Sequence, residues 1–175
     1  MEYIVLGLLM VEDLTVYQLN QAFNSGLSLI YSASYGSLLS ALKKLIKLGH
    51  IEFMETVENG RNKKIYHITD SGRRYFYEWM HADIPENKLE TIALSKVFFL
   101  GLVPEDNDKK DILQYIVSAI TEMENQLISL SDSLSELEFE EEAMKIYGYQ
   151  FKTLEYGIRT HRIAREWAQE LLNEL

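Results

Sequence analysis

The chain has 175 residues and a formal net charge of −10, with 47% hydrophobic residues and no cysteine. The apolar fraction is sufficient for a packed core, which excludes a wholly disordered chain, and the lack of cysteine excludes disulfides, thiolate chemistry and cysteine-based zinc sites. The first residues have no basic flank and no signal-peptide cleavage site, and no segment approaches the ~20 uninterrupted apolar residues of a membrane span. We therefore expect a cytoplasmic protein without a membrane partner.

Charge is distributed unevenly along the chain. Residues 1–82 contain eight Lys or Arg and eight Asp or Glu, whereas residues 83–175 contain nine Lys or Arg and nineteen Asp or Glu. All eight basic residues of the first half lie between positions 34 and 77, so we expect any surface for an anionic partner there. A break around Pro85 predicts two domains, residues 1–82 and residues 83–175.

The first half predicts a mainly α fold with a small two-stranded antiparallel wing. In chain order we expect helices at 3–10, 16–24 and 34–48, strands at 51–57 and 66–68 joined by a glycine-containing turn at 58–64, and a helix at 70–80. Thr15 is the expected N-cap of the second helix, and Ser32 or Ser34 that of the third. Gly49 suits the position after the third helix, and Thr69 suits the cap of the fourth.

The second half predicts only helices, at residues 89–102, 111–137 and 142–175. The second of these has apolar residues spaced alternately three and four apart, which is a heptad pattern: Leu113, Ile116, Ile120, Met123, Leu127 and Leu130. The last helix carries a comparable stripe that ends with Ile163, Trp167 and Leu171. Two interpretations remain open, core packing between the two long helices of one chain and dimerisation. About 90 residues cannot readily bury two long stripes alone, which favours a homodimer through these nine residues.

Three helices followed by a two-stranded wing form the pattern of a winged helix-turn-helix domain, in which the third helix fits the major groove of duplex DNA. Small and hydroxyl-bearing residues at the start of that helix can approach bases and phosphates: Ser34, Tyr35, Gly36, Ser37 and Ser40. Three lysines flank the groove: Lys43, Lys44 and Lys47. The wing tip is expected to contact the backbone: Gly60, Arg61, Asn62, Lys63 and Lys64.

Several stretches together resemble the PadR family of bacterial transcriptional regulators. They are Ile4-Val-Leu-Gly-Leu-Leu9, Tyr17, Ser34-Tyr-Gly-Ser-Leu-Leu-Ser-Ala-Leu-Lys-Lys-Leu45, Leu48-Gly-His-Ile51 and Gly60-Arg-Asn-Lys-Lys-Ile-Tyr-His-Ile-Thr-Asp-Ser-Gly72. The second half resembles the longer branch of the family, with a helical dimerisation domain, and within it the phenolic-acid-responsive repressors. The resemblance implies a homodimeric repressor that binds a double-stranded operator and is released by a small-molecule effector, such as a phenolic acid. It also adds Tyr17 to the DNA-binding candidates.

The sequence departs from the family at two places. Val16 stands where the family often has glycine, and Leu39-Ser40 stands where it often has Tyr-Pro. The second difference alters a surface that often faces DNA, so an operator sequence cannot be carried over.

Other classes of function have less support in the sequence. No nucleophile–base group, phosphate loop or dinucleotide fingerprint is present, so we expect no enzyme and no cofactor. The four histidines are scattered, so we expect no metal site. A protein-binding adaptor that uses the winged helix and the heptad seam remains the alternative. Two interpretations apply to the aromatic residues of the last helix and to Arg159, His161 and Arg162. They belong to the core and the dimer interface, or a few of them form the wall of an effector pocket.

Overall fold

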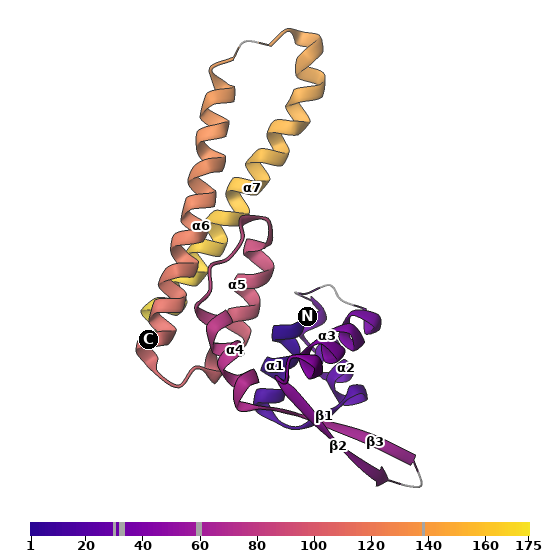
Figure 1. The fold of residues 1–175 in the computed structure, drawn as a ribbon. Coiled ribbons are helices and arrows are strands. Elements are labelled where there is room, and N and C mark those ends of the chain that lie inside the picture. The colour runs from indigo at the N-terminus through magenta and orange to yellow at the C-terminus, as the bar shows by residue number, and fades with distance from the viewer. Residues whose placement is uncertain (30, 32–33, 59–60, 138) are drawn as a thin grey trace. The chain divides into compact units, whose positions relative to one another are not determined.

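The computed structural model (Figure 1) describes residues 1–29, 31, 34–58, 61–137 and 139–175, without the side chains of Leu29, Glu58 and Arg61. By its contacts the chain divides into two units. The first unit comprises residues 1–83 and 90–104, and the second comprises residues 84–89 and 105–175. No helix in the described part of the chain is long and apolar enough to span a membrane.

The first unit is mainly helical with one small sheet. Its elements are α1 (Glu2–Val11), β1 (Leu14–Thr15), α2 (Val16–Asn24), the 3-10 turn η1 (Leu27–Leu29), α3 (Tyr35–Lys47), β2 (Ile51–Glu58), β3 (Arg61–Ile68), α4 (Asp70–His81), α5 (Leu89–Phe98) and the 3-10 turn η3 (Leu100–Leu102). The first residue of α5, Leu89, belongs to the second unit. The predicted α2 is confirmed residue for residue, and α3 is confirmed to within one residue at its end. The predicted fourth helix is also confirmed.

Local hydrogen bonds explain why α2 begins and α3 ends where the sequence predicts. The Thr15 hydroxyl accepts from the Gln18 backbone N–H at 3.3 Å, and the Gln18 side chain accepts from the Thr15 N–H at 3.0 Å, which together form a capping box. Gly49 follows α3 with φ of +70°, a conformation that only glycine adopts without strain.

The sheet has three antiparallel strands in the order β1-β3-β2, so the wing has one strand more than the sequence predicts. Leu14 pairs with Tyr66, and β2 pairs with β3 from Ile51↔Ile68 to Glu58↔Arg61. The predicted turn at 58–64 is therefore wrong, because Arg61 to Lys64 already belong to β3. Gly60 lies outside the described residues.

The core of the first unit forms around α1, whose Ile4, Val5, Leu6 and Leu9 are buried. Phe99 also belongs to this core, because its ring meets that of Phe76 at 5.8 Å. A Cβ on Gly7 would lie 2.6 Å from the Phe99 ring, so glycine is required for this close approach. Residues 90–104 thus pack with the first unit, while the predicted functional boundary after residue 82 stays a prediction. The predicted helix 89–102 is wrong at its end, because it stops at Phe98 and gives way to η3.

The second unit contains a short 3-10 turn, η2 (Glu86–Lys88), and two long helices, α6 (Asp106–Ser135) and α7 (Glu141–Asn173). The helix α6 begins five residues earlier than predicted. Figure 1 shows α6 and α7 running side by side as an antiparallel hairpin. A Cβ on Gly157 of α7 would lie 3.4 Å from Leu127 Cδ1 of α6, so the two helices are in close contact there.

Candidate nucleic-acid interface

The exposed side of α3 carries most of the predicted DNA-binding residues. Gly36, Ser40, Lys43 and Lys47 follow one another at spacings of four, three and four, and all four are exposed. The opposite side of the helix is buried through Leu38, Ala41, Leu42 and Leu45. Amphipathic spacing therefore fixes which side of α3 remains available to a partner.

The hydroxyl groups at the start of α3 are already engaged in the helix itself. Ser34 Oγ accepts from the Ser37 N–H at 3.2 Å, and Ser37 Oγ accepts from the Ser34 N–H at 3.1 Å. Ser40 Oγ donates to the Gly36 carbonyl at 2.9 Å. These serines primarily position the helix start, and a contact with DNA would use their remaining lone pairs or exchange these bonds.

Two predicted tyrosines are exposed and carry phenolic hydroxyls that can donate or accept. Tyr17 lies in the first turn of α2 with 74% of its surface exposed, and Tyr35 is the first residue of α3 with 54% exposed. Neither hydroxyl has a hydrogen-bond partner among the residues that the structure describes. Both are therefore available for phosphates or base edges.

The three predicted lysines of α3 differ in their surroundings. Lys44 Nζ lies 2.9 Å from Glu2 Oε1, and this hydrogen bond and charge raise the pKa of Lys44. Lys43 and Lys47 are exposed and have no ion-pair partner within the described ranges of the chain. Free positive charge on this helix thus belongs to Lys43 and Lys47.

The wing is less basic than its β3 sequence indicates. Lys64 Nζ lies 3.4 Å from Glu55 Oε1 across the strand pair and 4.0 Å from the centre of the Phe53 ring. Asn62 is exposed opposite Val57, and Lys63 is half-buried opposite Thr56. The backbone of Arg61 is in β3, but its side chain is outside the described part.

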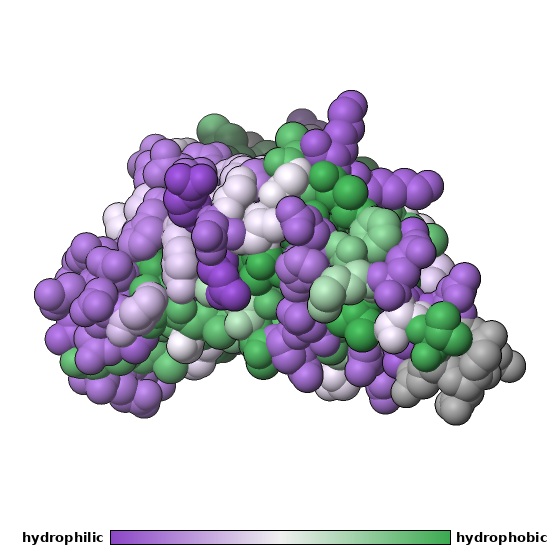
Figure 2. Space-filling model, turned by 60° about the horizontal axis from the view of Figure 1, so that its bottom comes forward, coloured by the Kyte–Doolittle hydropathy of each residue, from purple (hydrophilic) through white to green (hydrophobic). Residues whose placement is uncertain are grey.

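Figure 2 shows one face of the molecule, where hydrophilic residues cover much of the surface and hydrophobic residues lie between them.

Comparisons with known proteins show sequence similarity to transcriptional regulators. Residues 5–78 match the model of the Transcriptional regulator PadR-like family. The chain is also 28% identical over 144 residues to the Negative transcriptional regulator PadR of Bacillus subtilis (strain 168), which covers 79% of each chain. The family match thus covers most of residues 1–83, the first part of the chain that carries α1 to α4. Both matches are to transcriptional regulators.

Two solved structures are similar to this chain over nearly its full length. Bacillus subtilis PadR in complex with operator DNA is 23% identical with a TM-score of 0.46, covering 99% of this chain and 97% of that one. The protein smu.1604c of Streptococcus mutans UA159 is 27% identical with a TM-score of 0.47, covering 98% of both chains.

The predicted dimerisation residues fall into three groups by their exposure in the single chain. Leu113, Ile116 and Ile120 are buried in the single chain, Met123, Leu127, Trp167 and Leu171 are half-buried, and Leu130 and Ile163 are exposed. Tyr149 and Tyr156 precede Ile163 on α7 at seven-residue intervals, and this row is not among the sequence predictions. These three side chains are 76%, 69% and 66% exposed. Their spacing was visible in the sequence and could have identified them.

A buried carboxylate links the two long helices. Glu124 of α6 is only 5% exposed, and its two oxygens accept from Arg162 Nε at 3.1 Å and from Arg165 Nε at 2.7 Å of α7. The hydrogen bond from Arg165, and then that from Arg162, hold the pKa of Glu124 below its usual range. Arg162 is thus engaged in the hairpin, and Arg159 pairs with Glu155, so neither is an unoccupied receptor for an effector carboxylate.

The aromatic residues considered for an effector pocket lie in different places. Tyr147 and Phe151 pack against Phe139, with ring centres 5.0 Å and 5.6 Å apart, at the end of the hairpin. Tyr149 and Tyr156 are exposed instead. No group of three or more metal-ligating side chains occurs in the ranges that the structure describes.

Proposed function

We propose that this chain is a PadR-like transcriptional regulator that binds a double-stranded operator sequence-specifically through α3 and the wing. The observation that carries the proposal is the exposed stripe of Gly36, Ser40, Lys43 and Lys47. Glycine and serine permit close approach to the groove, and two lysines without an ion-pair partner among the described residues neutralise phosphates. Tyr17 and Tyr35 extend this surface on both helices. Since the proposed target is the chromosome, the expected place of action is the cytoplasm.

The proposed active form is a homodimer. Tyr149, Tyr156 and Ile163 recur at the heptad interval on α7, which is the spacing that a partner helix requires, and they remain exposed in the single chain. A second copy would cover them and would make the two α3 helices related by a two-fold axis. Half-sites about one DNA turn apart, ~34–36 Å, then follow.

Repression and release by an effector complete the proposal. The curated relative is a negative regulator, which supports repression here. A ligand changes operator affinity only to the extent that it binds the DNA-competent and DNA-incompetent states differently. The sequence resemblance suggests a phenolic acid as one class of effector.

The test is enrichment of operator DNA by the full chain. Fragmented genomic DNA is incubated with the protein, and bound fragments are sequenced. We expect a common motif with two-fold symmetry, and we expect the mass of a dimer in solution at micromolar concentration. Recovery without any sequence preference, with a tight protein partner in pull-down, would favour the adaptor function instead. A monomeric mass would rule out the two-fold operator.

A further inference from the structure

A cavity of about 200 Å³ lies within the second unit, between the segment 84–89 and α6. It is lined by Ile84, Glu86, Leu89, Tyr115, Ala119, Glu122, Met123 and Gln126. The proposed operator-binding surface uses none of these residues. They also lie outside the row of Tyr149, Tyr156 and Ile163 that is proposed for dimerisation, although Met123 belongs to the α6 stripe predicted from the sequence.

The two buried side chains that line the cavity, Ile84 and Leu89, are apolar, and one hydrogen bond holds the segment 84–89 against α6. The Ile84 N–H donates to Tyr115 Oη at 3.1 Å, which fixes the start of the segment against α6. Ile84 and Leu89 are buried, and Met123 is half-buried. A cavity on the order of 150 Å³ can hold a benzene ring, so one aromatic or branched aliphatic group fits here.

The rim of the cavity is acidic. Glu86 and Glu122 are exposed, and neither carboxylate has a hydrogen-bond or ion-pair partner among the described residues. Of the described residues that line the cavity, none is Lys, Arg or His. Two carboxylates that have no partner among the described residues attract a cation and repel a carboxylate, and the Tyr115 ring adds a surface that favours cations.

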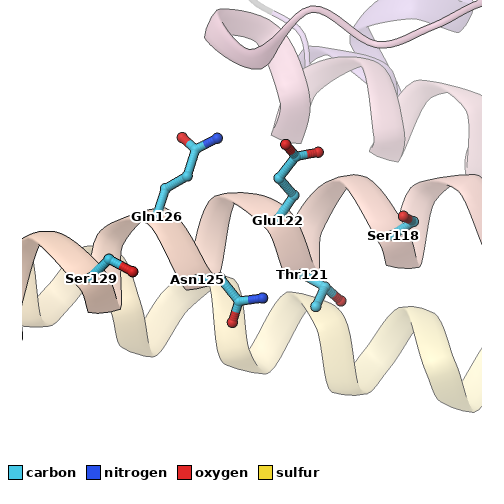
Figure 3. A pocket seen from close by; sticks show the side chains of 6 residues that line it. All are labelled: Ser118, Thr121, Glu122, Asn125, Gln126 and Ser129. Atoms are coloured by element: carbon cyan, nitrogen blue, oxygen red, sulfur yellow. The ribbon is translucent and has the colours of Figure 1, made fainter.

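An open groove of about 690 Å³ along α6 leads to the same rim, and its lining includes Glu122 and Gln126. In Figure 3 both side chains project from the same side of α6, whereas Thr121 and Asn125 project from the other side. Ser118 and Ser129 also line the groove, so it offers neutral hydrogen-bonding groups to a longer ligand.

We propose that this cavity binds a small organic ammonium ion with one aromatic or branched aliphatic group. The apolar group occupies the cavity beside Met123 and Leu89, and the ammonium lies at the rim between Glu86 and Glu122. This ligand class is the opposite in charge of a phenolic acid, which would bring its carboxylate to two like charges.

The regulatory consequence rests on the proposed operator binding. The chain passes from the first unit to the second between Asp83 and Ile84, and returns between Leu89 and Glu90. Both crossing points adjoin the segment that forms one wall of the cavity. A bound ligand therefore constrains the segment that connects the two units, and the expected result is a changed operator affinity.

The direct test is isothermal titration calorimetry of the full chain with phenethylammonium chloride, and with 3-phenylpropionate as a probe of similar shape and opposite charge. We expect saturable binding of the ammonium only. Glu86→Gln with Glu122→Gln should weaken it at least about tenfold, because two attractive charges are removed. Glu136→Gln, at the end of α6 and outside the cavity, is the matched control and should leave the affinity unchanged.

Three outcomes of the calorimetry would overturn the site. They are the absence of saturable ammonium binding, equal binding of 3-phenylpropionate, and an unaltered affinity in the double variant. A second measurement addresses regulation: fluorescence anisotropy of the protein on an enriched operator duplex, with and without saturating phenethylammonium. An unchanged operator affinity would overturn the regulatory role. Failure to bind the operator without any ligand would refute the proposed function and leave the calorimetric result standing.

Discussion

Replacing Lys43 and Lys47 with alanine is the sharpest test of how α3 meets DNA. Both side chains are exposed and have no ion-pair partner in the described part of the chain, so each can neutralise one phosphate. Every neutralised phosphate contributes about 0.9 to the slope of log K against log salt concentration. Each single variant should therefore lower the slope by about 0.9, and at about 0.1 M salt should weaken binding roughly eightfold. The double variant should lower it by about 1.8 and weaken binding roughly 60-fold.

Lys44→Ala provides a contrast on the same helix. Lys44 already has Glu2 as its counterion at 2.9 Å, so its contact with a phosphate would release fewer salt ions. We expect the slope to change by less than half of the change caused by Lys43→Ala. Some affinity should still be lost, because removal of Lys44 leaves the Glu2 carboxylate unpaired beside the DNA-binding surface.

The assay is fluorescence anisotropy on a labelled operator duplex, at salt concentrations between about 50 and 300 mM. Lys145→Ala with Lys152→Ala changes the net charge equally on α7 and serves as the control. Thermal unfolding should show that all variants remain folded, since every replaced side chain is exposed. Phosphate contacts by Lys43 and Lys47 are refuted if the double variant keeps the original salt slope, or if the α7 control lowers that slope as much.

Three further predictions concern stability and assembly. Lys96 is 1% exposed, and burial lowers its pKa to about 8. Above pH 8 the folded chain therefore binds fewer protons than the unfolded chain, and the free energy of unfolding should rise by up to about 1.4 kcal/mol per pH unit. Lys96→Met should abolish this rise in urea unfolding between about pH 7.5 and 9.5. Gly72→Ala should cost about 3 kcal/mol or more in the same measurement, because its Cβ would lie 2.0 Å from the His50 carbonyl oxygen; a loss below about 1 kcal/mol would contradict this clash. Tyr149→Glu with Tyr156→Glu should give a monomeric mass by light scattering, and a retained dimer would show that this side of α7 is not the interface.

The first unit could be predicted from the sequence wherever the signal is local. Thr15 and Ser34 cap their helices through residues three positions away, and Gly49 ends α3 by its own backbone conformation. The short β1 could not be predicted, because two residues carry no alternation and its partner lies about 50 positions later. Tertiary pairing, which local patterns do not encode, creates this strand.

The available charge on the candidate DNA surface also depends on tertiary contacts. The sequence places a net positive charge between residues 34 and 77, but it does not show that Glu2 pairs with Lys44 from another helix. Glu55 faces Lys64 only because the β2–β3 register sets them opposite each other. Among the lysines of α3, Lys43 and Lys47 therefore supply the available positive charge. For this reason we expect the largest change in the salt slope from their replacement.

The apolar stripes of the second unit are compatible both with core packing inside one chain and with dimerisation, so the sequence does not distinguish the two. A heptad stripe requires a partner helix, yet its spacing does not specify whether that helix belongs to the same chain. The α6 stripe loses Leu113, Ile116 and Ile120 to burial in the single chain. An antiparallel hairpin can cover only one side of α7, whereas Tyr149, Tyr156 and Ile163 form a second apolar row that drifts by only about 20° per heptad. Because large apolar side chains in such a row are stabilised by burial, we expect the dimer contact on this outer side of α7, with the α6 stripe serving the hairpin core.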